Sequence, residues 1–93
     1  MTIGLLEVKI KIDNSHSLKE KRMILRSLKE RLRNKFNIAI SEVGEQDKWQ
    51  ISQLCLVSVN TDKRFLNSLL CKIMEFIQNF PQIEVIDYHT EFI

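Results

Sequence analysis

Glycine and proline are nearly missing from this sequence, which holds two glycines and one proline in 93 residues. Flexible linkers and disordered tails are rich in such residues and poor in apolar ones, whereas 44% of this chain is hydrophobic. The length is also that of one ordinary domain. We therefore expect a single domain over residues 1–93, without a linker.

Long apolar runs are missing as well. The longest, Leu54 to Val57, holds four residues, whereas a membrane-spanning helix needs about 20. The first residues also lack the basic start and the long apolar stretch of a secretion signal. These absences predict a cytoplasmic protein that has no membrane partner.

Metal-binding and disulfide motifs do not occur either. The two cysteines, Cys55 and Cys71, form no CxxC pair, and His16 and His89 form no HxH or HExxH motif. Both cysteines lie in apolar segments, so we expect reduced thiols within the core. The acids near the middle of the chain do not follow the spacing of a calcium loop. The sequence therefore predicts no metal, no cofactor and no catalytic residues, and hence a protein that is not an enzyme.

The hydrophobic pattern predicts six secondary-structure elements. Apolar and polar residues alternate over 3–13, as in a half-buried strand. Ser17 followed by Glu20 forms a capping box, which predicts a helix start, and leucines at helical spacing continue to Phe36. Further strands are expected over 37–43, 49–59 and 83–92, with a second helix between the polar residues 60–62 and Pro81.

The resulting order is β-α-β-β-α-β, which predicts an α+β fold. Right-handed crossovers place both helices on one face of a four-stranded antiparallel sheet, the ferredoxin-like sandwich. The other face has no helix to cover it. On that face we expect Lys9, Lys11, Ser52, Leu54, Leu56 and Ser58. One interpretation is a homodimer through this open sheet face or through a strand edge; the alternative is that scattered apolar residues on an open sheet need no partner.

Charge is distributed unevenly along the chain. Residues 18–36 hold eight basic and two acidic side chains, a net charge of +6, while the rest of the chain carries −4. Five of these cations recur at intervals of three and four residues and so lie along one flank of the expected helix. They are Lys19, Arg22, Arg26, Lys29 and Arg33. Their line is about 21 Å long, which suits a nucleic-acid backbone; the alternative is a solvated helix face.

The segment before this helix offers a second, weaker site. A helix N-terminus presents free N–H groups and a partial positive charge, and cations follow directly here. His16, Ser17 and Lys21 are the residues that could bind a phosphate or another anion. Small-anion chemistry in this loop is the enzymatic alternative. The segment lacks a glycine-rich phosphate cradle, so an ordinary capped helix is the competing interpretation.

Several segments resemble a known family of small bacterial proteins. The segments Ser15-His16-Ser17-Leu18-Lys19-Glu20-Lys21-Arg22, Leu25–Leu28, Arg31–Asn37 and Asp47-Lys48-Trp49-Gln50 are similar to the YlxP family, and the similarity extends over essentially the whole chain. The resemblance implies a ferredoxin-like fold, an unknown function and no established catalytic residues. It also implies a connection with translation, because genes of this family often lie beside those for a translation initiation factor and ribosome-binding factor A.

Pattern and resemblance together favour a non-enzymatic binding module that contacts RNA or a ribosomal subunit through the basic face of the first helix. Base stacking on the sheet is not expected, because the first strand has no aromatic residue and the third has only Trp49 at its edge. The alternative is a self-associating or protein-binding module that has no nucleic-acid role.

Overall fold

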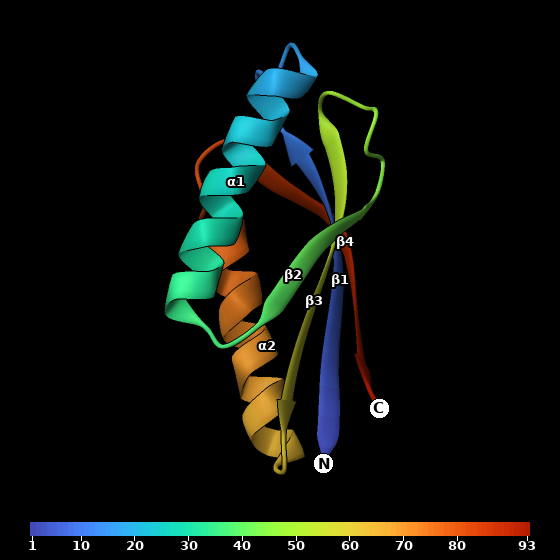
Figure 1. The fold of residues 1–93 in the computed structure, drawn as a ribbon, viewed down its shortest axis with the longest axis vertical. Coiled ribbons are helices and arrows are strands. Elements are labelled where there is room, and N and C mark those ends of the chain that lie inside the picture. The colour runs from blue at the N-terminus through green and yellow to red at the C-terminus, as the bar shows by residue number, and fades with distance from the viewer.

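The computed structural model describes residues 1–93 and contains four strands and two helices. In chain order they are β1 (Thr2–Ile12), α1 (Leu18–Lys35), β2 (Ala39–Gly44), β3 (Ile51–Asn60), α2 (Lys63–Gln78) and β4 (Ile83–Phe92). This is the order that the hydrophobic pattern predicts. Figure 1 shows both helices on the same side of the sheet.

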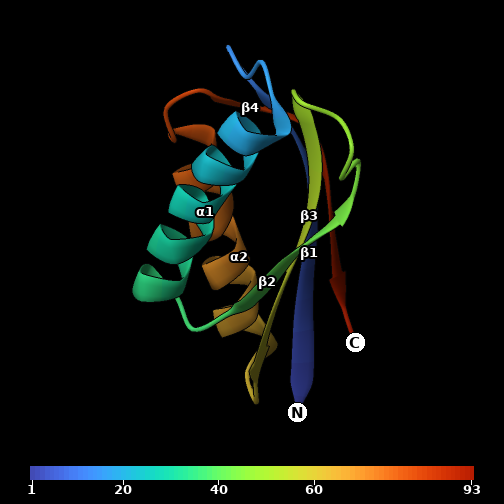
Figure 2. The ribbon, with the colours of Figure 1, turned by 45° about the horizontal axis from the view of Figure 1, so that its top comes forward.

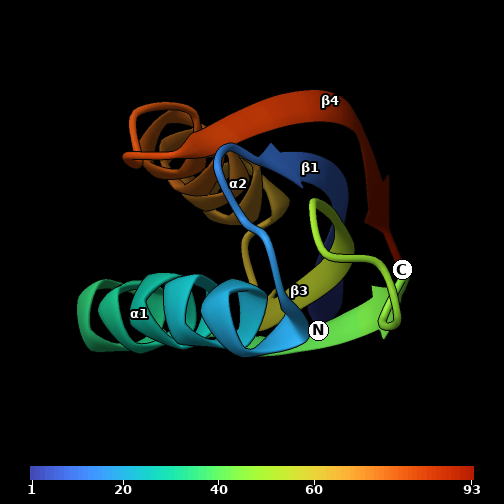
Figure 3. The same cartoon turned by 90° about the horizontal axis from the view of Figure 1, so that it is seen from above.

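The sheet has the strand order β2-β3-β1-β4, and every neighbouring pair of strands is antiparallel. Each helix therefore crosses over one strand before the chain returns to the sheet, which leaves β1 and β3 in the centre and β2 and β4 at the edges. The helices form one layer and the twisted sheet forms the other (Figures 2 and 3). The ferredoxin-like α+β sandwich is confirmed.

The core lies between these two layers. Leu6, Val8 and Ile10 of β1 are at most 1% exposed and face the helices, because alternate residues of a strand point to the same side. Both helices cover them with apolar side chains at helical spacing. These are Leu25, Leu28 and Leu32 of α1, and Leu66, Leu70, Ile73 and Ile77 of α2. Each such side chain contributes about 1.5–3 kcal/mol when it is fully buried.

The expected orientation of β3 was wrong. Ser52, Leu54, Leu56 and Ser58 are buried against the helices and do not lie on the open sheet face. Strand pairing sets this orientation, because Leu54 lies opposite Val8 and Leu56 opposite Leu6, and directly opposite residues share a face. The open face carries the alternate residues of the strand, which are Ile51, Gln53, Cys55, Val57 and Val59. Both faces of β3 contain apolar residues, so alternation alone did not decide between them.

Three single residues also differ from expectation. Cys71 is exposed on α2, and Cys55 is half-buried on the open sheet face, so neither free thiol lies in the core between the layers. Trp49 precedes β3 and is 54% exposed.

Neither helix combines the length and the apolar character that crossing a membrane requires.

Candidate nucleic-acid interface

Helix α1 is fixed at both ends by local hydrogen bonds. The side-chain oxygen of Ser17 accepts a hydrogen bond from the N–H of Glu20 (3.1 Å), and the Glu20 carboxylate accepts one from the N–H of His16 (2.8 Å). The bond to Ser17 is the predicted N-cap, whereas Glu20 reaches back to the N–H of His16 and not to that of the N-cap residue Ser17, so the predicted capping box is only half formed. At the other end the N–H of Phe36 donates to the carbonyl of Leu32 (2.8 Å). The helix between these caps therefore presents its flanking side chains from a regular backbone.

The predicted cations lie together on one flank of α1. Leu25, Leu28 and Leu32 turn one face of the helix into the core, and the cations follow beside that face at intervals of three and four residues. We call them the basic stripe: Lys19, Arg22, Arg26, Lys29 and Arg33. Four of them are exposed and Lys29 is half-buried, so the charges of the stripe reach solvent.

None of these five cations has a carboxylate partner. The two ion pairs of the structure are Lys21–Glu42 and Lys48–Glu45, and both lie outside the basic stripe. Within the stripe, Arg33 donates from Nη2 to the backbone oxygen of Ile40 at 3.2 Å. A carbonyl is a neutral acceptor, so this bond orients the guanidinium without cancelling its charge.

A groove of about 370 Å³ lies between the basic stripe and β2. Its walls are Arg22, Leu25, Arg26, Lys29, Glu30, Arg33 and Glu42. Four cations face two carboxylates there, and one of the carboxylates, Glu42, is already paired with Lys21. The groove therefore carries a net positive charge along one side of α1.

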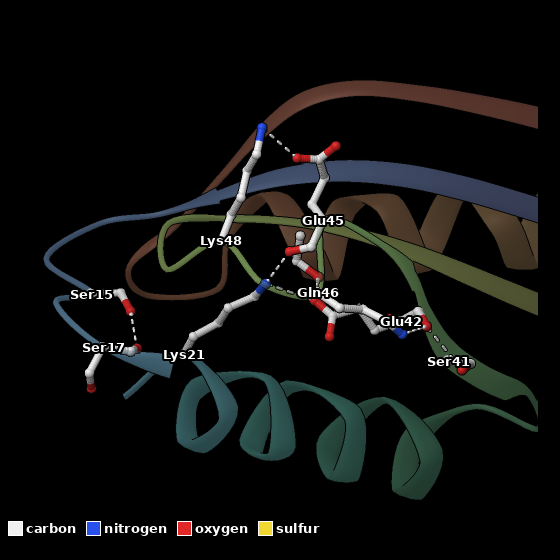
Figure 4. A network of polar contacts seen from close by, with 9 residues as sticks. Ser15, Ser17, Lys21, Ser41, Glu42, Glu45, Gln46 and Lys48 are labelled. Atoms are coloured by element: carbon white, nitrogen blue, oxygen red, sulfur yellow. Dashed lines mark hydrogen bonds and ion pairs between the residues drawn. The ribbon is translucent and has the colours of Figure 1, made fainter. Parts of the chain in front are cut away.

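Lys21 does not have the role that the sequence suggested. It is 1% exposed and points away from solvent, so it is not available to an external anion. Its Nζ lies 2.9 Å from Oε2 of Glu42 and donates to the backbone oxygen of Glu45 at 2.6 Å (Figure 4). The same Glu42 oxygen accepts a hydrogen bond from Ser52 Oγ at 2.6 Å. Lys21 is therefore a buried connection between α1 and the loop after β2.

A signal for this inward orientation was present in the sequence. Lys21 lies four residues before Leu25 and seven before Leu28, and residues at that spacing share one helix face. The cation therefore belongs to the leucine face and not to the basic stripe.

Part of the predicted anion site at the start of α1 is already used by the protein's own groups. The N–H groups of His16 and Glu20, on either side of Ser17, bond to the side chains of Glu20 and Ser17. The carboxylate of Glu20 also supplies the negative charge that a helix N-terminus favours. With Lys21 turned inward, the three predicted residues do not converge on a common ligand position.

The loop between β2 and β3 is held beside the start of α1. Besides the bond from Lys21, the side chain of Gln50 donates to the backbone oxygen of Ser15 at 3.1 Å. Within the loop, Lys48 and Glu45 form an ion pair with an N–O distance of 2.9 Å. The hydrogen bond and the charge of Lys48 lower the pKa of the Glu45 carboxyl, and Glu45 in turn raises the pKa of Lys48.

A second groove, of about 400 Å³, lies between α1 and α2. No sequence motif predicted this groove. The Arg31 guanidinium lies 5.4 Å from the ring centre of Phe80, and Lys35 Nζ lies 5.2 Å from that of Phe76. Both cations therefore lie over aromatic rings. The available signal was the spacing of four residues within each pair, Arg31 with Lys35 and Phe76 with Phe80.

No cluster of three or more metal-ligating side chains exists in the structure.

Fold and surface together define a small ferredoxin-like α+β protein with one strongly basic helix. Residues 3–90 match the family described as "Protein of unknown function (DUF503)". The "Uncharacterized protein YlxP" of Bacillus subtilis (strain 168) is 38% identical over 89 residues, covering 96% of this chain and 97% of that protein. The chain therefore belongs to this family, and the resemblance drawn from its motifs is confirmed. The function of the family is unknown.

A solved structure with low sequence identity shares the fold. The "De novo designed protein Foldit4" matches with a TM-score of 0.59 and 14% identity, covering 96% of both chains. A second designed protein, LFR1 1 "with ferredoxin fold", matches with a TM-score of 0.46 and 14% identity, covering 100% of this chain and 84% of the other. At such identities the similarity concerns architecture alone.

Proposed function

We propose that this protein is a non-enzymatic binding module that contacts RNA, free or within a ribosomal subunit, through the basic stripe of α1. The observation that supports the proposal is the absence of any carboxylate partner for the five cations. A solvated helix surface commonly alternates charges of opposite sign so that they pair. Here five cations extend along the helix flank without forming an ion pair.

The form of the stripe favours an extended polyanion over a small anion. Lys19 and Arg33 are fourteen positions apart, which corresponds to about 21 Å along a helix. A single phosphate or carboxylate would contact one or two of these side chains, whereas a nucleic-acid backbone presents phosphates at regular intervals. The groove beside the stripe opens to solvent along α1, so a strand could lie in it without entering an enclosed pocket.

Such an interface should bind RNA with little dependence on the base sequence of the RNA. Contacts to phosphate oxygens provide affinity and position without identifying bases. The stripe itself contains no aromatic side chain on which bases could stack. Specificity would therefore depend on the shape of the RNA.

The test is the salt dependence of RNA binding. If all five cations contact phosphates, a plot of log K against log salt concentration has a slope of about −3.5 to −4.5, from roughly 0.7–0.9 per contact. Replacing Arg22 and Arg26 by glutamate should make the slope shallower by about 1.4–1.8 and reduce affinity severalfold at low salt. Both arginines lack side-chain partners within the protein, so the fold should be retained.

The matched control is the double variant Arg64→Glu with Lys72→Glu. It changes the net charge by the same amount at two exposed cations outside α1. Binding that falls equally in both double variants would indicate a general charge effect. RNA binding that is absent in the wild type, or unchanged in the Arg22→Glu, Arg26→Glu variant, would overturn the proposal.

A further inference from the structure

One end of the open sheet face carries a contiguous apolar patch. Strand pairing places Ile3 opposite Val59, and Leu5 opposite Val57. On either side, Ala39 lies opposite Val57 and Ile93 exchanges two backbone hydrogen bonds with Ile3, each 2.8 Å. Because directly opposite residues share a face, these side chains form one surface across β2, β3, β1 and the residue that follows β4. We call it the apolar patch: Ile3, Leu5, Ala39, Val57, Val59 and Ile93.

Nothing in the fold covers this patch. Both helices lie on the opposite side of the sheet (Figure 3), and Val59 and Ile93 remain 57% and 65% exposed. Single exposed apolar residues are ordinary, but a contiguous set on a flat face is typical of a surface that binds another protein.

The charges around the patch exclude RNA as its occupant. The remainder of the open face carries Lys9 and Lys11, which lie opposite Asp87 and Glu84 of β4. Adding the other charged residues of the face, Glu7 and Glu91, gives two positive and four negative side chains. A polyanion would be repelled there. A second copy of the chain fits, because a two-fold axis can bring the lysines of one face over the carboxylates of the other.

We propose that the open sheet face is the interface of a homodimer in which the two sheets pack face to face. Strands about 4.8 Å apart and residues about 3.3 Å apart along a strand give about 16 Å² per residue. The four strands, of 11, 6, 10 and 10 residues, therefore present roughly 600 Å² per protomer. Two copies together bury about 1,200 Å², which lies at the lower limit for a specific interface. The contact is isologous, since the same patch serves both protomers. This proposal does not depend on RNA binding.

Light scattering and sedimentation equilibrium test the proposal directly. The wild-type protein should dimerise with a Kd in the micromolar range, as expected for an interface near the lower size limit. Val57→Lys places a charge in the centre of the patch and should weaken the dimer at least about tenfold. The control Phe65→Lys changes a residue of α2 that is 53% exposed and lies outside the open face, so it should leave the dimer intact.

A cross-link provides a second readout that does not require the Val57 variant to fold. In a Cys71→Ser background the single thiol is Cys55, which lies on the open face opposite Glu7. A short bifunctional maleimide should then join two chains through Cys55, and dilution below the Kd should abolish the product. Monomeric protein up to about 200 µM, well above the Kd of even a small specific interface, would overturn the proposal. A dimer that persists in Val57→Lys would overturn it too, and would indicate pairing of strand edges.

Discussion

The buried ion pair between Lys21 and Glu42 predicts a strong and specific dependence of folding stability on Lys21. The Nζ of Lys21 contacts Glu42 at 2.9 Å and the carbonyl of Glu45 at 2.6 Å. The change Lys21→Met keeps the length of the side chain and its apolar stem but removes the ammonium group. Glu42 is then left as a carboxylate at the boundary of the core without a counter-ion.

The size of the stability loss depends on the interactions that Glu42 retains after Lys21 is replaced. Removing one partner of a fully buried pair costs about 3–5 kcal/mol. Glu42 keeps the hydrogen bond from Ser52 and its side chain is 18% exposed, so the loss should be smaller, about 2–3 kcal/mol. In a domain of this size each kcal/mol corresponds to roughly 4–8 °C in Tm. The expected fall in Tm is therefore about 10–20 °C.

Urea unfolding followed by circular dichroism measures this loss. The double variant Lys21→Met with Glu42→Gln removes the unpaired charge as well, and it should recover at least about 1 kcal/mol relative to the single variant, because neutral replacements of both partners are tolerated. RNA affinity of the folded Lys21→Met protein should remain that of the wild type, since Lys21 is inaccessible. A loss below about 1 kcal/mol, or a double variant no more stable than the single one, would refute the reasoning.

Three further predictions concern local features. Ser17→Ala removes the capping hydrogen bond and should cost about 1 kcal/mol in urea unfolding. Lys48→Met should raise the pKa of Glu45 toward its ordinary value of 4.5 in an NMR titration. Because Lys48 lowers the pKa of Glu45, their ion pair stabilises the loop above that ordinary value, and the contribution is lost as pH falls through the lowered pKa. Thiol reagents should label the exposed Cys71 before Cys55, because burial and then the charge of Glu7 raise the pKa of the Cys55 thiol.

The fold could be predicted from sequence because local and global signals agree. The alternation in β1, the capping box at Ser17 and the helix stop at Pro81 each specify one element, and their order leaves one compact arrangement. The orientation of β3 could not be predicted in the same way. Its sequence has apolar residues on both faces, and only the pairing with β1 places Leu54 and Leu56 inside.

Only those residues of the candidate interface that recur at helical spacing could be predicted from the sequence. Helical spacing alone places Arg22, Arg26 and Arg33 on one flank, and the structure leaves them unpaired. Lys21 was assigned by its charge and its place in a basic segment, although its spacing from Leu25 and Leu28 puts it on the buried face. The carboxylate that pairs with it there, Glu42, follows 21 positions later in the chain. A partner so distant in sequence cannot be inferred from local periodicity.

The two proposed surfaces are compatible because the sandwich separates them. The basic stripe belongs to α1 and the apolar patch to the open face of the sheet, and both helices lie on the other side of the sheet from that face (Figures 1 and 3). A dimer that packs sheet against sheet turns both α1 helices outward, so association buries no cation of the stripe. The salt slope for a short RNA should therefore be the same for monomer and dimer, since each molecule of RNA meets one stripe. A longer RNA that reaches both stripes would gain affinity through the second contact, which becomes intramolecular after the first.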